Sequence, residues 1–287
     1  MILLDFIFKK ERKIKMLKNI YDSHTHSKNS HDGIDTVDAM CNHALKNGIL
    51  GFALTDHCEL DQFYKPEIKA GTQGSFDDMT KAKEKYGDKL LLSCGVELGQ
   101  MIMDEELRKS ILSKNNYDFV LGSMHCIVGK SDFCMYDYSQ WELSDIYKLL
   151  EKYYEEMYRT VKLDNFDSFA HITYPLRYIE GNFGIKIDIT KYEDYIDGVL
   201  KTLAENGKAL EINTSGLRQK LGRTMPTMDY AQRFKSFGGE LITLGSDAHR
   251  ADDMAKGIAE TMENLEAIGF SHIAFFKERK PIMIEIK

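Results

Sequence analysis

The sequence predicts an α/β fold in which parallel strands form either a barrel or a long open sheet. Short apolar runs bounded by polar turns alternate with longer stretches of helical spacing, which is typical of consecutive βαβ units. Such units join parallel strands through right-handed crossovers. Glycines follow several helical stretches, where a left-handed C-cap favours them. Hydrophobic residues make up 43% of the 287 residues, so the chain can bury a full core.

The apolar runs predict seven strands, and the intervening periodic stretches predict helices. The expected strands cover residues 19–24, 51–57, 91–97, 117–125, 166–172, 209–215 and 241–247. The clearest helical stretches cover residues 38–48, 143–161, 194–207 and 228–239. No repeat, low-complexity tract or linker interrupts this pattern. We therefore expect a single domain over residues 19–287, preceded by an N-terminal extension over residues 1–18.

Residues able to bind a metal follow strand after strand. Seven of the nine histidines occupy predicted strand ends or the loop after the first strand, and only His43 and His272 fall in expected helices. The potential ligands at the strand ends are His24, His26, Asp56, His57, Glu97, His125, His171, Asp247 and His249, and His31 lies in the loop after the first strand. In a barrel, the carboxyl ends of all strands converge on one face, so these side chains would meet there.

The local spacing of these residues supports metal binding. His24 and His26 alternate to one side of an extended chain, although an isolated HxH pair is also common in polar turns. Glu97 ends an apolar strand, where a carboxylate is costly unless it is paired or ligating. Together the donors exceed the four ligands of one tetrahedral zinc, so two or three ions are implied. We interpret Asp22 and Asp56 as acceptors that orient imidazoles, with turn capping as the alternative.

Six segments, taken together and in order, resemble the motifs of the PHP (polymerase and histidinol phosphatase) family: "DSHTH", "LTDHCE", "GVELG", "GSMH", "AHITYP" and "LGSDAH". The resemblance runs over roughly residues 20–250. It implies a distorted (β/α)7 barrel with three divalent metal ions, which could be zinc, manganese or iron. The ligand sets that it implies are His24, His26, Glu97 and Asp247 for one ion; Glu97, His125 and His171 for a second; and His31, His57 and His249 for the third.

Clustered divalent ions suit the hydrolysis of phosphate monoesters, because they activate water and neutralise the phosphate oxygens. We therefore expect a metal-bridging hydroxide as the nucleophile, with Asp247 or His249 as the group that helps to protonate the leaving alkoxide. Arg177 and Arg223 follow strand ends and could clamp the phosphate. Arg218 and Arg250 are further candidates. For each arginine the alternative is an ordinary surface position.

The segment "LEINTSGLRQKLGRTMPT" is similar to the histidinol-phosphatase branch of the family, which implies hydrolysis of L-histidinol phosphate in histidine biosynthesis. The alternatives are a PHP phosphoesterase for a phosphotyrosine protein or a nucleotide, and a metal-binding protein without turnover. No cysteine is followed six positions later by arginine and no DxD occurs, which excludes cysteine-based and aspartyl-phosphate phosphatases.

Composition limits the partners of the protein. The net charge of -7, without a basic stripe, disfavours nucleic acid and favours a small phosphorylated metabolite. Five cysteines without a CxxC pair indicate a reducing cytoplasm. No stretch approaches the roughly 20 apolar residues of a membrane helix, so no membrane is expected. The sequence does not indicate an oligomeric state.

Overall fold

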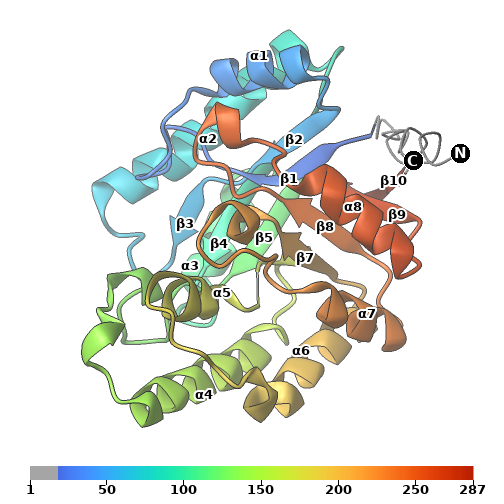
Figure 1. Cartoon of the computed structure of the whole chain (residues 1–287). Coiled ribbons are helices and arrows are strands. Elements are labelled where there is room, and N and C mark those ends of the chain that lie inside the picture. Colours follow the sequence, from blue (N-terminus) through green and yellow to red (C-terminus); the bar gives the residue numbers. More distant parts are fainter. Residues whose placement is uncertain (1–18, 287) are drawn as a thin grey trace, which may run out of the picture.

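A computed structural model describes residues 19–286, and its strands form a nearly closed barrel (Figure 1). Seven parallel strands follow one another around it: β1 (Tyr21–Thr25), β2 (Gly51–Leu54), β4 (Leu91–Gly99), β5 (Phe119–Ser123), β6 (Ser168–Phe169), β7 (Ala209–Asn213) and β8 (Ile242–Gly245). At the seam between β1 and β8, the His26 amide donates to the Ala248 carbonyl at 2.8 Å. The Asp247 amide donates to the His24 carbonyl at 2.8 Å. The predicted α/β barrel is therefore confirmed.

Helices connect the strands and surround the barrel (Figure 1). The longer ones are α1 (Val37–Asn47), α2 (Pro66–Tyr86), α3 (Glu105–Lys114), α4 (Leu143–Thr160), α6 (Glu193–Glu205), α7 (Met228–Ser236) and α8 (Ile258–Ala267). The sequence predicted α1, α4, α6 and α7, but not α2, α3 or α8. The expected left-handed glycines are present, with φ of 67° at Gly48 and 61° at Gly207. Between β6 and α6 the chain forms α5 (Tyr174–Leu176) and a π-helical segment, η3 (Arg177–Asn182).

Three further strands complete the structure. The short strand β3 (His57–Glu59) pairs with β4 beside the barrel path. β9 (His272–Lys277) and β10 (Lys280–Glu285) form an antiparallel hairpin that the sequence did not predict. His272 begins β9, so its expected place in a helix was wrong. The hairpin packs beneath the barrel: Phe275 contacts Tyr21 at the start of β1, and Phe276 contacts Phe119 at the start of β5.

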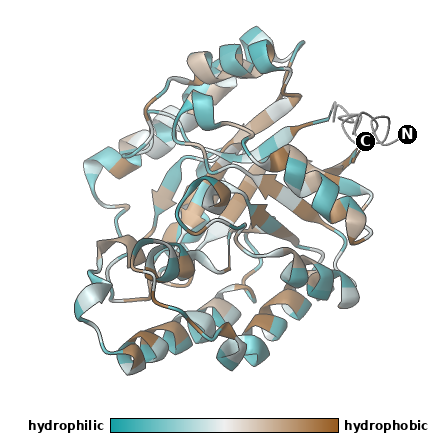
Figure 2. Ribbon diagram, viewed as in Figure 1, coloured by the Kyte–Doolittle hydropathy of each residue, from teal (hydrophilic) through white to brown (hydrophobic). Residues whose placement is uncertain are grey.

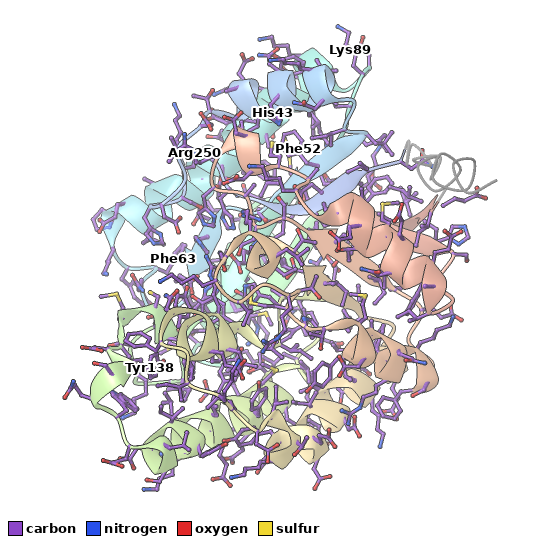
Figure 3. The ribbon with its side chains drawn as sticks, in the orientation of Figure 1. His43, Phe52, Phe63, Lys89, Tyr138 and Arg250 are labelled. Atoms are coloured by element: carbon purple, nitrogen blue, oxygen red, sulfur yellow. The ribbon has the colours of Figure 1, made fainter. Side chains whose placement is uncertain are left out.

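Apolar residues line the strands and the inner faces of the helices, whereas the outer faces are hydrophilic (Figure 2). One core cluster joins the barrel to α3, α4, α6, α7, α8 and the hairpin. A second cluster packs α1 and α2 against β2, and includes Met40, Met79 and the fully buried Phe52 (Figure 3). Burial of each such side chain contributes about 1.5–3 kcal/mol. The two clusters pack the strands against the helices and the hairpin, and the candidate functional site lies at the carboxyl ends of the strands.

Two sequence predictions reach beyond what the structure tests. A single domain over residues 19–287 stays a prediction, and the expected extension over residues 1–18 lies outside the described residues. Among residues 19–286, no helix combines the length and the apolar character needed to cross a membrane.

Candidate metal centre

Glu97 lies at the centre of the candidate site, at the carboxyl ends of the strands. Its side chain is fully buried at the end of β4. Five imidazole nitrogens surround its two carboxylate oxygens: His125 Nε2 at 3.0 Å and His171 Nε2 at 3.1 Å from Oε1, and His57 Nδ1 at 2.8 Å, His24 Nε2 at 3.3 Å and His26 Nε2 at 3.7 Å from Oε2. One carboxylate therefore faces two groups of imidazoles, as a ligand shared by two ions would.

The donor atoms gather in small groups with the spacing that a metal ion requires. Ligand atoms within 4.8 Å of one another form four groups in the described part of the chain: His24, His26 and Glu97; Glu97, His125 and His171; His26, His57 and His249; and His57, Glu59 and His125. Asp247 Oδ1 lies 3.4 Å from His26 Nε2 and 3.8 Å from His24 Nε2. The arrangement can hold metal ions, and it brings together eight of the nine predicted ligands.

His31 is the predicted ligand that the structure does not bring into these groups. Its side chain is 61% exposed, and its Nε2 lies 3.9 Å from Asp32 Oδ2. Asp32 occupies the expected place instead, with Oδ2 3.0 Å from His249 Nε2 and 3.7 Å from His57 Nε2. The loop after β1 turns the neighbouring side chain inward, and no periodicity in a loop could have distinguished the two residues.

Several buried atoms of the site have no hydrogen-bond partner, which is the test of whether a metal fits. They are His24 Nε2, His26 Nε2, His57 Nδ1, Glu59 Oε2, Glu97 Oε2 and His249 Nε2. Buried polar atoms are almost always satisfied, because leaving one unpaired costs about 1–3 kcal/mol. Lone pairs that converge without hydrogen-bond geometry are what a metal ion needs. The donor set of imidazoles and carboxylates also suits divalent transition metals.

The electrostatics of the site fit the same interpretation. Burial alone would raise the pKa of Glu97, but His125, His24 and His57 lower it well below its usual value. Burial lowers the pKa of His26 well below its usual range, and the neighbouring His249 and His57 lower it further. Imidazole binds metals in its neutral form and carboxylate in its charged form, so Glu97 and His26 are already in the form that binds a metal. Burial lowers the pKa of His24, His57 and His125, but the surrounding carboxylates raise it well above its usual value, so metal binding would release a proton from each of these imidazoles.

Two buried glutamates orient the imidazoles, and the sequence analysis missed both roles. Glu211 Oε1, from β7, lies 2.6 Å from His24 Nδ1, and Glu59 Oε1, from β3, lies 2.8 Å from His125 Nδ1. In both cases the other ring nitrogen, Nε2, points toward the centre. Such carboxylates fix the tautomer and direction of a ligating imidazole. The signal in the sequence was an acid within an apolar run, as in "ALEIN".

Asp22 and Asp56 do not contact imidazoles as expected. Asp22 accepts hydrogen bonds from the backbone amides of Ser246 at 2.9 Å and Ala255 at 2.8 Å, so it holds the loop after β8. Asp56 accepts from the Ser27 amide at 2.6 Å and from Ser30 Oγ at 2.9 Å. Both are fully or nearly fully buried. They position the loops that carry the ligands instead of the ligands themselves.

A cavity of about 590 Å³ opens above the metal-binding groups, and Arg177 lines it. Arg177 Nη1 donates to Asp247 Oδ2 at 3.2 Å. Arg177 begins the π-helical segment η3, a type of distortion that is frequent at functional sites. Asp247 and His249 line the same cavity. All three predicted catalytic residues thus surround one space next to the candidate ligands.

The other candidate arginines do not reach this cavity. Arg223 donates to Glu180 Oε2 at 2.9 Å and is not among the residues that line it. Arg218 donates to the carbonyls of Ser246 at 2.6 Å and Asp247 at 2.8 Å, and so supports the loop after β8. Arg250 is exposed and precedes the short 3₁₀ helix η6 (Ala251–Asp253), on the side of the molecule where His43 lies (Figure 3). The predicted phosphate clamp is therefore reduced to Arg177.

Comparison with known proteins identifies the family. The family model described as PHP domain matches residues 22–215, which include all the candidate ligands except Asp247 and His249. The chain belongs to the PHP domain family. The resemblance seen in the sequence is therefore confirmed.

Relatives within the PHP family match almost the whole chain. A probable histidinol-phosphatase of Clostridium acetobutylicum is 30% identical over 263 residues, covering 91% of this chain and 98% of that protein. The histidinol-phosphatase of Lactococcus lactis is 26% identical over 264 residues, covering 90% and 95%. The crystal structure of the histidinol phosphate phosphatase from Lactococcus lactis, complexed with zinc, L-histidinol and phosphate, superimposes with a TM-score of 0.75 at 24% identity, covering 92% of this chain and 99% of that one.

Two candidate ligands of this PHP barrel have a strained backbone. The φ of His171 is 44° and that of Asp247 is 53°, in the left-handed region that non-glycine residues rarely adopt. Each residue follows the end of a strand, β6 or β8, and the turn directs its side chain toward the centre of the site. Such strain persists where the surrounding structure enforces it, and it gathers at functional sites.

Proposed function

We propose that the protein is a metal-dependent phosphomonoesterase that hydrolyses L-histidinol phosphate to L-histidinol and phosphate, as a step of histidine biosynthesis. The observation that supports it most is the position of Glu97, buried among five imidazoles beneath an open cavity. The relatives named histidinol-phosphatase match nearly the full chain and support this substrate.

The proposed metal centre holds three divalent ions. His24, His26, Glu97 and Asp247 would hold the first, and Glu97, His125 and His171 the second. His57 and His249 would hold the third with Asp32, in place of His31. The ions could be zinc, manganese or iron, because imidazole and carboxylate ligands accept each of these. When bound, they would supply Lewis acidity that activates water and neutralises charge on the phosphate.

The side chains around the cavity would bind and orient the ester. Arg177 would donate its planar N–H groups to the phosphate oxygens, and its contact with Asp247 holds the guanidinium toward the centre. Asp247 and His249, the two residues predicted to protonate the leaving alkoxide, both line the cavity. Burial alone would raise the pKa of Asp247, but His24, His26 and His249 lower it well below its usual value, so this carboxyl is charged and His249 is the candidate proton donor. Glu211 and Glu59 would hold the imidazoles of His24 and His125 in the orientation that ligation needs.

The cavity also suits a cationic organic group. Glu59, Asp61 and Asp132 line it, together with the rings of Tyr174 and Tyr178. The acids come from β3 and from the segments after β3 and β5, whereas the aromatic rings come from the segment after β6. Five free cysteines, four of them buried, agree with the proposed cytoplasmic location.

The test is phosphate release by the full-length, metal-loaded protein. We expect kcat/KM for L-histidinol phosphate of about 10⁴ M⁻¹s⁻¹ or above. Rates on p-nitrophenyl phosphate, a phosphotyrosine peptide and single-stranded DNA, measured alongside, should be far lower. Comparable low rates on all four compounds would show that L-histidinol phosphate is not the substrate. If the protein binds metal but hydrolyses none of the four, the proposed phosphatase activity is wrong.

A further inference from the structure

We propose that Tyr178 is a positioning residue for Arg177. The face of its ring supports the guanidinium and leaves the N–H groups of the arginine for the phosphate of the substrate. The inference rests on the proposed phosphatase function, and in particular on Arg177 as the residue that binds the phosphate. Tyr178 acts through Arg177 and not through the reacting atoms.

The side chain of Arg177 has two contacts that fix its direction. Its Nη1 donates to Asp247 Oδ2 at 3.2 Å, which is the one hydrogen bond between this guanidinium and the described residues. Its guanidinium carbon lies 5.6 Å from the centre of the Tyr178 ring, within the range of a cation–π contact. Arg177 and Tyr178 are both half-buried, and both line the cavity.

A ring suits an arginine that must also bind a phosphate. A carboxylate or carbonyl partner orients a guanidinium by occupying its N–H groups, whereas an aromatic ring interacts with the charge and leaves those groups free. Arginine binds phosphate through two parallel N–H···O bonds, so it needs several free donors. With one N–H group on Asp247 and the Tyr178 ring beside the guanidinium, Arg177 keeps its other donors for the phosphate.

The Tyr178 ring is itself held at its hydroxyl end. The hydroxyls of Tyr178 and Tyr174 lie 3.0 Å apart, and the Tyr174 hydroxyl donates to Asp132 Oδ1 at 3.1 Å. Because Tyr174 gives its only hydroxyl proton to Asp132, Tyr178 is the donor to Tyr174. Asp132 Oδ1 in turn accepts from the Cys134 amide at 2.8 Å, in the segment after β5. This chain of hydrogen bonds fixes the ring next to the guanidinium.

Tyr178 can be changed without a direct effect on the candidate metal ligands. The Tyr174 ring packs on the rings of His125 and His171, with centroids 4.9 Å and 5.1 Å away. Among the described residues, the Tyr178 ring contacts one aromatic ring, that of Tyr174. A substitution at Tyr178 therefore acts on Arg177 and leaves the imidazoles in place, whereas one at Tyr174 would disturb both.

A double-mutant cycle on the full-length, metal-loaded protein tests the proposal. The two measurements are kcat/KM for L-histidinol phosphate and calorimetric binding of inorganic phosphate. Tyr178→Leu should lower both kcat/KM and phosphate affinity by about 10-fold, as for a partly desolvated cation–π contact. In an Arg177→Met background, the same substitution should lower them by less than about 2-fold, because the residue through which Tyr178 acts is gone.

Two further variants control for the ring and for the loss of a tyrosine. Tyr178→Phe keeps the ring and should lower kcat/KM by less than about 3-fold. Tyr147→Leu removes another half-buried tyrosine that lies beneath a cation, Lys191, but outside the cavity. It should change neither quantity. Metal content per chain should equal that of wild type in every variant.

The outcomes separate this inference from the proposed function. If Tyr178→Leu hydrolyses L-histidinol phosphate and binds phosphate as wild type does, the positioning role is wrong and the phosphatase stands. The role is also wrong if the loss persists in the Arg177→Met background, if Tyr178→Phe loses as much as Tyr178→Leu, or if Tyr178→Leu loses metal. If phosphate binding follows the expected pattern without hydrolysis of L-histidinol phosphate, Tyr178 positions Arg177 and the proposed function is wrong. If the metal-loaded wild-type protein neither binds phosphate nor hydrolyses the ester, both proposals fail.

Discussion

A hydrogen bond of 2.6 Å joins His24 Nδ1 to Glu211 Oε1 beneath the candidate metal centre, and both side chains are fully buried. The glycine of the next strand makes room for the pair, because a Cβ on Gly245 would lie 2.4 Å from both Glu211 Oε1 and His24 Cβ. The pair links β7 to β1 past β8, so the direction of one proposed ligand depends on a residue 187 positions away in the chain.

The first prediction concerns this pair. Glu211→Gln keeps the shape but removes the charge that orients the His24 ring, so metal affinity or kcat should fall by about 10- to 100-fold. Metal content after dialysis at defined free zinc, together with kcat, measures the effect. Glu240→Gln, at an exposed position, is the matched control and should change neither quantity. If neither metal content nor kcat changed in Glu211→Gln, the pair would be only structural.

The second prediction distinguishes Asp32 from its neighbour His31. Asp32→Ala removes the oxygen next to His57 and His249, so the protein should bind fewer ions per chain and lose activity by about 100-fold or more. His31→Ala should change activity by less than about 3-fold, because its exposed ring lies outside the ligand groups. Ions per chain and kcat/KM measure both variants. The reverse pattern would restore His31 as the ligand.

The sequence was most informative where strand periodicity and chemistry coincide. A ligand at the end of an apolar strand has a defined position, which is why His24, Glu97 and His125 were predicted in their places. Asp32 lies in a loop, where spacing does not determine direction. Glu211 was visible as a buried acid between Leu210 and Ile212, but its partner His24 comes from the far end of the chain, and only the closed barrel brings them together.

The missed elements have identifiable physical causes. Helix α2 contains Gly71 and Gly74, which lower helix propensity, yet a Cβ at Gly71 would lie 2.3 Å from the Asn29 carbonyl oxygen. The glycine lets the loop after β1 pack closely against the helix, but it also weakens the helical pattern in the sequence. The turn between β9 and β10 uses Glu278 and Arg279 with φ of 50° and 62°, where asparagine and glycine are usual, so the hairpin carried no recognisable turn motif.

The third prediction compares two arginines. Arg177→Met should lower kcat/KM for phosphate esters by about 100-fold, because it removes N–H donors next to the proposed phosphate position. Arg223→Met is the control, because Arg223 pairs with Glu180 outside the cavity, and its kcat/KM should stay within about 3-fold of wild type. Steady-state kinetics of both variants measure these kcat/KM values. An equal loss of kcat/KM in both variants would mean that Arg223 also binds the phosphate.

The fourth prediction concerns metal removal. Chelation should lower the Tm by about 5–10 °C, because it leaves the buried Glu97 and Asp247 carboxylates without their proposed metal partners. Re-addition of zinc should restore the Tm. Glu97→Gln, which carries no charge, should show a much smaller difference between chelated and zinc-loaded protein. A Tm that does not respond to verified removal of metal would contradict metal binding at this site.

The fifth prediction separates stability from activity at the two ends of the barrel. Phe276 of β9 is buried against Phe119, with ring centroids 5.2 Å apart, and its carbonyl accepts a 2.7 Å hydrogen bond from Ser93 Oγ. These contacts lie at the amino-terminal ends of the strands, opposite the ligands. Phe276→Ala should therefore lower the free energy of unfolding by about 3–5 kcal/mol, as for other large cavities in a core.

In the same variant, metal content and kcat per folded molecule should remain at wild-type values, because the ligands are positioned from the other end of the strands. Denaturant unfolding and kinetics on one preparation measure both quantities. Tyr64→Ala, at a side chain that is 79% exposed, should change the free energy of unfolding by less than about 0.5 kcal/mol. A loss of metal in Phe276→Ala would mean that the hairpin sets the geometry of the site through the strands, and that the two ends of the barrel are coupled.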